Sequence, residues 1–312
     1  MPLPKGVGLG LHWAWVPFWG FIFGCATIIS LLVIWLAQGH PRYKQDEATV
    51  VYISDVGADN HALFIVLGTL TALLFFASIF LDYRLRHTAR IPQRVRRIER
   101  VSAALSVIFA FICALGCILL TIFDAFRHQT LHWTFSGIFF VALLLSGLFN
   151  MIELGALTRD YRENKKIKAS FFLKLAVVIP GIIAIIIMGC LMKRCDDRTP
   201  PGASDYITCN GPDSAAASLE WFVTALFCLY ILTLVFDMYP SRMTSRHRNT
   251  PPMSLVPPTQ TAPGKKGGFF AKGKGKSQAP HGTTTEVGGV PAAGLTNGHN
   301  AQPVIPPGSS MV

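Results

Sequence analysis

The sequence predicts an all-α protein, in which six helices form a transmembrane bundle and a disordered C-terminal cytosolic tail follows. Of the 312 residues, 51% are hydrophobic and 14% are charged, whereas a soluble domain has about 25% charged residues. The mean hydropathy is +0.42. This composition excludes a water-soluble globular protein and a wholly disordered chain.

Six apolar segments are long enough to cross a bilayer, whose hydrocarbon core takes about 20 residues of helix. Each is apolar on all sides, which separates it from an amphipathic surface helix. Because lipid offers no hydrogen-bond partner to the backbone, each segment is expected to be helical. After a short cytosolic N-terminus at 1–13, the segments cover residues 14–37, 61–81, 101–123, 134–157, 171–192 and 218–238.

Residues 239–312 have a different composition, rich in Pro, Gly and Lys and poor in large apolar side chains. Such a segment cannot bury enough apolar surface to offset its chain entropy. We therefore expect these residues to form a disordered tail.

Basic residues are divided unevenly between the two sides of the predicted membrane domain. If the N-terminus is cytosolic, 16 Lys and Arg near the membrane fall on that side and six on the other. Cytosolic loops of membrane proteins carry the excess of Lys and Arg. Both termini are therefore predicted to lie in the cytosol.

A few ionisable residues lie inside the predicted spans, close to their cytosolic ends. Glu153 and Lys174 could pair with each other, or Lys174 could extend its amine to the interface. Asp82 and Asp237 end their spans at the same face. A transporter usually carries charges near the midplane or broken helices in matching halves. Pro180 marks a break in only one span, which disfavours a transporter.

Polar residues on the opposite side of the membrane form the first candidate site. Asp124, His128 and His132 are spaced by four, so they share one face if the helix continues through them. With Asp55 and Glu220 at the same membrane level, they could form an acid–base cluster. Asp124, His128 and His132 could also ligate a metal. The alternative is a structural network of polar groups that meet water at helix ends. We expect no cofactor.

Two cysteines lie on the predicted oxidising side of the membrane. A disulfide between Cys195 and Cys209 would close a loop of about 15 residues and contribute roughly 3 kcal/mol. The remaining cysteines lie within spans and are expected to pack as small apolar residues.

The predicted cytosolic face carries two clusters of basic residues, one in the loop after the second span and one in the tail. Clusters of four to eight basic residues beside a membrane are typical of contacts with anionic lipid. The alternative is that these charges only set the topology and keep the tail solvated. Candidate lipid contacts are Arg94, Arg96, Arg97, Lys265, Lys266, Lys272, Lys274 and Lys276.

Four short motifs resemble those of the FRAG/DRAM/SFK family of multi-span membrane proteins. The family includes damage-regulated autophagy modulators, fungal SFK-type proteins and the N-terminal region of CWH-type GPI-lipid remodelling proteins. The motifs recur in family order across residues 14–238, and the tail resembles those of fungal members. They are Tyr52-Ile53-Ser54-Asp55-Val56-Gly57-Ala58, Leu85-Arg86-His87-Thr88, Phe123-Asp124 with Arg127-His128, and Glu220-Trp221.

The resemblance implies a six-span protein of the plasma membrane or endomembrane system with a role in lipid homeostasis. It makes Asp55, Asp124, His128 and Glu220 the leading site residues, without assigning them a catalytic mechanism. We expect a non-enzymatic protein whose basic face anchors or regulates a phosphoinositide kinase or supports lipid asymmetry. A GPI-lipid remodelling factor or autophagy modulator is the alternative, ahead of a transporter. The expected partners are membrane lipids, with phosphoinositides and a peripheral lipid-kinase complex as candidates, and no nucleic acid.

Overall fold

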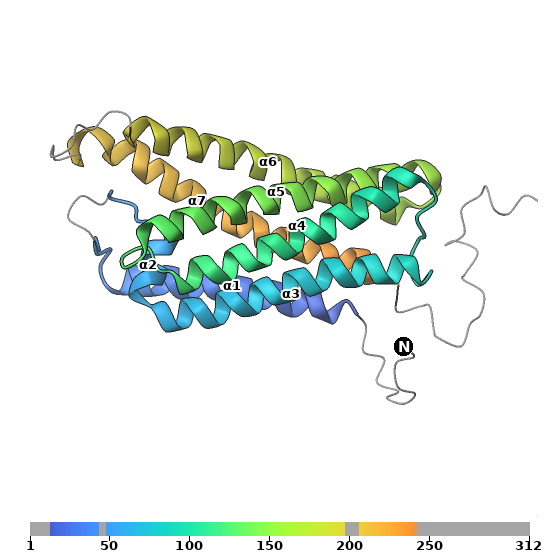
Figure 1. Cartoon of the computed structure of the whole chain (residues 1–312), viewed down its shortest axis with the longest axis horizontal. Helices are drawn as coiled ribbons and strands as arrows, with labels where there is room; N and C mark the ends of the chain where they lie inside the picture. The colour runs from blue at the N-terminus through green and yellow to red at the C-terminus, as the bar shows by residue number, and fades with distance from the viewer. Residues whose placement is uncertain (1–12, 44–47, 197–205, 240, 242–312) are drawn as a thin grey trace, which may run out of the picture. The chain divides into compact units, whose positions relative to one another are not determined.

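The computed structural model describes residues 13–43, 48–196, 206–239 and 241, and within them every regular element is a helix (Figure 1). Six helices are long and apolar enough to cross a membrane, which confirms the all-α, six-span prediction. The N-terminal residues 1–12 and the tail from residue 242 lie outside the described residues. The helices are α1 (Trp15–Ala37), α2 (Ile53–Asp59), α3 (His61–His87), α4 (Arg97–Ile122), α5 (Gln129–Asp160), α6 (Lys165–Asp196) and α7 (Tyr206–Met238).

Most spanning helices extend beyond the apolar segments predicted from the sequence. Helix α5, for example, covers Gln129–Asp160 where residues 134–157 were expected. The added turns carry polar and basic side chains, which can reach the interface while their backbone stays helical. Helix α6 also continues through Pro180. The break expected there is therefore absent, since neighbouring helices can support a proline within a membrane helix.

Two helix pairs and α1 with α3 build the bundle. Helix α4 packs along α5, α6 packs along α7, and α3 joins α4 to α1, which also contacts α7 (Figure 1). The largest apolar core lies where these pairs meet, around Phe75 of α3 and Phe227 and Ile231 of α7. Ring centroids of Phe75 and Phe227 are 5.1 Å apart in an edge-on arrangement.

Helices α4 and α5 approach each other closely. The Oγ of Ser106 donates to the Ser146 carbonyl at 3.0 Å, and the Oγ of Ser146 donates to the Ser106 carbonyl at 3.0 Å. Nearer α2, a Cβ added to Gly116 would lie 3.1 Å from the backbone nitrogen of Phe139. Small residues and interhelical hydrogen bonds of this kind drive helix association in lipid, where apolar burial gives no advantage.

The two ends of the bundle differ in chemistry. At one end lie the α3–α4 and α5–α6 connections with their Arg and Lys residues, and we call it the basic end. At the other end lie α2 and the α4–α5 connection, and we call it the α2 end.

The substitution Gly116→Leu tests the close α4–α5 contact. We expect it to lower the thermal unfolding midpoint of the detergent-purified protein, because the new side chain meets Phe139 backbone that cannot move aside, and overpacking costs roughly 1–3 kcal/mol. The matched control is Gly137→Leu on α5, where nothing lies within 4 Å of the added Cβ. Equal midpoints for the two variants would contradict the close contact.

Candidate functional site

A buried lysine lies inside the membrane domain at the basic end. Lys174 of α6 has no exposed surface, and its Nζ lies 2.8 Å from Oδ2 of Asp237 on α7. The same amine donates to Oγ1 of Thr233 at 2.9 Å, and the hydroxyl of Ser170 donates to Asp237 Oδ1. Lys174 therefore pairs with Asp237, and both alternatives expected from the sequence, a pair with Glu153 and a lysine extended to the interface, are wrong.

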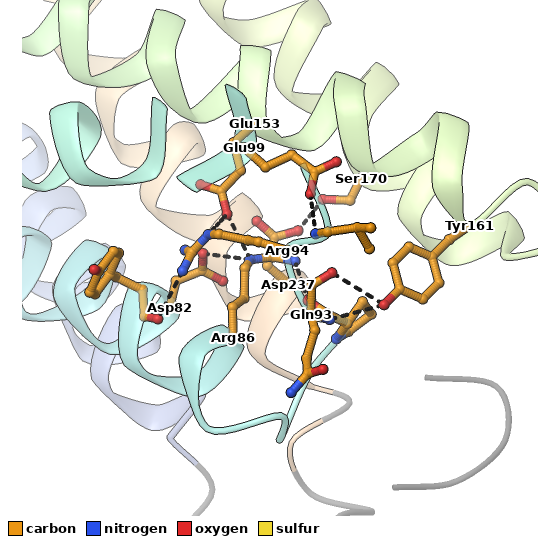
Figure 2. Close-up of polar contacts among 12 residues, drawn as sticks. Asp82, Arg86, Gln93, Arg94, Glu99, Glu153, Tyr161, Ser170 and Asp237 are labelled. Carbon is orange, nitrogen blue, oxygen red and sulfur yellow. Dashed lines mark hydrogen bonds and ion pairs between the residues drawn. The ribbon is translucent and has the colours of Figure 1, made fainter. Parts of the chain in front are cut away.

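A second group of buried charges joins α3, α5 and the α3–α4 connection (Figure 2). The Nε of Arg86 lies 2.9 Å from Oδ2 of Asp82 and 3.3 Å from Oε1 of Glu153. Arg94 contacts the same Glu153 oxygen through its Nε at 2.7 Å, and its Nη1 donates to the Tyr83 carbonyl at 3.2 Å. Glu153 thus holds one arginine from a helix and one from a loop.

Together these groups form what we call the buried ionic network, which contains three cations and three carboxylates. An unpaired charge inside a bilayer is costly, so ionisable residues there face the bundle interior and pair with one another. The balance of signs leaves the network formally neutral. Its charged members are Asp82, Arg86, Arg94, Glu153, Lys174 and Asp237.

Further contacts fix the α3–α4 connection over the network. Oε2 of Glu99 accepts hydrogen bonds from the backbone N–H groups of Val95 at 2.6 Å and Arg96 at 3.1 Å, which caps the start of α4. Tyr161 binds Gln93 twice, accepting from its N–H at 3.1 Å and donating to its carbonyl at 3.2 Å. Burial raises the pKa of Tyr161 to about 12. This connection is therefore held on both sides by buried side chains.

The arginines predicted to contact lipid differ in how far they are exposed at the basic end. The Arg94 side chain is 6% exposed and bound to Glu153, so its guanidinium lies in the bundle interior. Arg96 is 47% exposed but forms a two-pronged contact with Asp160, its Nη2 lying 2.6 Å from Oδ1, and this hydrogen bond raises the pKa of Arg96. Arg97 is exposed. Outside the described residues lie Lys265, Lys266, Lys272, Lys274 and Lys276.

At the α2 end, Glu220 and Trp221 of α7 hold the segment that leads into α2. Oε2 of Glu220 accepts the backbone N–H of Ile53 at 2.8 Å, and the indole N–H of Trp221 donates to the Val51 carbonyl at 3.1 Å. Upstream, the N–H of Thr49 donates to an Asn210 side chain of α7 at 2.8 Å. These bonds satisfy backbone groups of the segment that leads into α2.

Asp124 holds the turn between α4 and α5. Its Oδ1 accepts the backbone N–H groups of Phe126 at 2.9 Å and Arg127 at 2.7 Å. Burial alone would raise the pKa of Asp124, but these N–H groups and the nearby Arg127 guanidinium outweigh it and lower the pKa below its usual value. The backbone N–H groups of the α4–α5 turn thus stabilise the charged form of Asp124, and Asp124 in turn holds these N–H groups in place.

The two histidines of the predicted cluster have separate environments. His132 is buried, and its Nδ1 lies 3.0 Å from the Leu120 carbonyl and 2.9 Å from the Phe123 carbonyl, so this nitrogen carries the proton. His128 is exposed and lies edge-on to the ring of Phe123. In the described part of the chain, no three His, Cys, Asp or Glu residues come together as a metal site.

Asp55 and Glu220, which the sequence places at one membrane level, do come together at the α2 end. Asp55 is buried within α2, next to the segment that Glu220 binds. Burial raises the pKa of Tyr52, and the negative charges of Asp213, Glu220 and Asp55 add to that shift. Tyr52 therefore lies close to carboxylates of both α2 and α7.

Cys209 at this end is buried and disulfide-bonded. The side chain of its predicted partner, Cys195, lies outside the described residues. The pairing of Cys195 with Cys209 therefore stays a prediction.

Fold and sites together define a six-span helical membrane protein in which polar side chains at each end bind the connecting segments. The chain belongs to the family described as Frag1/DRAM/Sfk1/Cwh43P N-terminal domain, whose family model matches residues 12–241. It is 26% identical over 234 residues to protein sfk1 of Schizosaccharomyces pombe, a match that covers 72% of this chain and 66% of the relative. No solved structure is similar.

The substitution Trp221→Phe tests whether the Glu-Trp motif holds the segment before α2. Loss of the indole N–H leaves the Val51 carbonyl without this donor, and such a bond contributes about 1 kcal/mol. We expect amide hydrogen exchange in residues 48–60 to accelerate roughly fivefold, measured by mass spectrometry. Trp19→Phe on the exposed face of α1 is the control, since, among the described aromatic rings, that of Trp19 contacts only Phe18 and Phe23 of its own helix. Unchanged exchange in Trp221→Phe would show that the indole does not hold the segment.

Proposed function

We propose that this protein is a non-enzymatic membrane organiser, which supports lipid homeostasis by presenting the basic end to the cytosolic leaflet. In this proposal both termini are cytosolic, and the basic end recruits anionic lipids and a peripheral lipid-kinase complex. The carrying observation is an exposed band of cations beside exposed apolar side chains at that end.

The band begins where α4 leaves the α3–α4 connection. Arg97 and Arg100 are exposed, and they alternate with Ile98 and Val101, which are 54% and 48% exposed. Apolar side chains at this position fit the acyl boundary, while the guanidinium groups fit the phosphates above it. Anionic lipid attracts such residues by about 1 kcal/mol each.

The first turn of α6 adds a second set of cations to the band. Lys165, Lys166 and Lys168 are exposed there, and Phe172 one turn further is 63% exposed. Both sets of cations flank the buried ionic network. The network therefore holds the exposed positive charges in fixed positions. A fixed surface suits a peripheral partner as well as lipid headgroups.

The contacts at the α2 end support a non-enzymatic reading over the alternative of GPI-lipid remodelling or autophagy modulation by an Asp/His/Glu patch. Asp124, His132 and Glu220 each bind a backbone group of a neighbouring segment through one side-chain atom. A catalytic acid or base needs a polar atom directed at a substrate proton.

The double substitution Arg97→Gln and Arg100→Gln tests the proposal. The full-length variant is purified from nanodiscs that contain equal amounts of neutral lipid and phosphatidylinositol 4-phosphate. We expect the ratio of anionic to neutral lipid that it retains to fall about tenfold below that of the wild type. Native mass spectrometry of the retained lipids provides the measurement. Higher salt should reduce the wild-type enrichment.

The matched control is Lys193→Gln, an exposed cation at the opposite end of the bundle. It should leave the enrichment unchanged. Equal lipid enrichment in the double variant and the wild type, at both low and high salt, would refute the lipid part of the proposal. In cells, an unchanged phosphoinositide profile after deletion of the gene would refute the kinase part.

A further inference from the structure

Three side chains beside the buried ionic network each carry a polar atom that has no hydrogen-bond partner among the described residues. They are Oδ1 of Asp82 on α3, Oδ1 of Asn150 on α5 and the hydroxyl of Tyr230 on α7. The three residues are 2%, 4% and 3% exposed, so bulk water does not reach these atoms. A buried polar atom without a partner is costly, and nearly all such atoms in native proteins bind protein or ordered water.

Tyr230 lies between the two groups of charges that make up the network. The centroid of its ring is 4.9 Å from Nζ of Lys174, which is paired with Asp237. Tyr230 is also near enough to Asp82 and Glu153 for their charges to act on its hydroxyl. These two carboxylates belong to the group that Arg86 joins. Tyr230 is therefore in reach of both groups.

Asn150 approaches the same place from α5. It precedes Glu153 by three residues, and residues at this spacing are neighbours on one side of a helix. Because α5 and α7 both run toward the basic end, Asn150 lies deeper in the membrane than Glu153, and Tyr230 lies deeper than Asp237. Asn150 and Tyr230 thus border the network on its membrane-interior side, where Asp82 adds its second oxygen from α3.

The three atoms cannot satisfy one another. Oδ1 of Asp82 and Oδ1 of Asn150 only accept hydrogen bonds, and the single O–H of Tyr230 can serve one acceptor at a time. A water molecule supplies the missing donors, since it can accept from the Tyr230 hydroxyl and donate to both oxygens. About three hydrogen bonds are typical of a water buried in a protein.

A neutral ligand suits this place better than an ion does. The three cations and three carboxylates of the network balance, so a bound ion would leave an uncompensated charge inside the bilayer. A cavity of about 40 Å³ borders Tyr230 and also Gly147, which precedes Asn150 by one turn of α5. One water needs at least about 10–15 Å³ of such space. Packing beside Tyr230 thus leaves room for a molecule of this size.

We infer that a water molecule binds between Tyr230, Asp82 and Asn150 and joins the two groups of the buried ionic network. The water accepts the hydrogen bond of the Tyr230 hydroxyl and donates to Oδ1 of Asp82 and Oδ1 of Asn150. It connects α7 to α3 and α5, so that the network forms one hydrogen-bonded unit. The inference does not depend on the proposed lipid contacts.

The test is X-ray radiolytic labelling of the full-length protein in nanodiscs prepared in heavy-oxygen water, followed by mass spectrometry. Radiation turns a bound water into a hydroxyl radical, which oxidises the side chain beside it. We expect heavy oxygen on Tyr230 although this residue is buried. Phe75, an apolar ring with no exposed surface in the same core, is the internal reference and should take up much less.

Asn150→Leu removes one acceptor and keeps the size of the side chain. It should lower the labelling of Tyr230 about fivefold, the loss expected for one hydrogen bond. The matched control is Ser146→Ala on the same helix, because the Ser146 hydroxyl already has a partner in the Ser106 carbonyl. This control should label Tyr230 as the wild type does.

Tyr230→Phe keeps a reactive ring and removes the donor, and it decides the case if Asn150→Leu does not fold. The labelling of residue 230 should again fall about fivefold. Absence of heavy oxygen on wild-type Tyr230 would overturn the inference. Labelling of residue 230 that is equal in the wild type and in the folded Asn150→Leu or Tyr230→Phe variant would also overturn it.

Discussion

Three cations and three carboxylates buried at the basic end are the constraint on which the rest of the structure depends. They come from α3, α5, α6, α7 and the α3–α4 connection. Removing one partner of a buried pair costs roughly 3–5 kcal/mol, because the remaining charge is left in a medium that cannot solvate it. The helices must therefore keep the rotation and depth that place Lys174 beside Asp237 and Glu153 beside Arg86 and Arg94.

The same constraint separates buried from exposed cations within one short loop. Arg94 is bound beneath the surface, and this fixes the path of the chain to Arg97 and Arg100, which are exposed. At the α2 end, side chains of α7 bind the backbone before α2 in a comparable way. Family motifs at both ends thus join distant segments, which explains their polar character without requiring catalysis.

Hydropathy predicts the six spans because a helix in lipid must be apolar over about 20 residues whatever its neighbours are. Helix α2 could not be predicted, since its seven residues depend on hydrogen bonds from α7, about 170 positions further along the chain. The partner of Lys174 depends on how α6 and α7 are rotated, which composition does not encode. The sequence predicts that Asp55 and Glu220 lie at the same membrane depth and can therefore come close together. It does not predict which backbone groups these side chains bind.

The central claim is that the buried ionic network fixes the α3–α4 connection, and hydrogen exchange in Glu153→Gln tests it most directly. This change keeps the side-chain shape but removes the charge that binds Arg86 and Arg94. The account predicts that amides of residues 91–96 exchange at least about tenfold faster, while those of 53–59 keep their wild-type rates. Wild-type protection of residues 91–96 in the folded variant, or an equal acceleration at both ends, would contradict it.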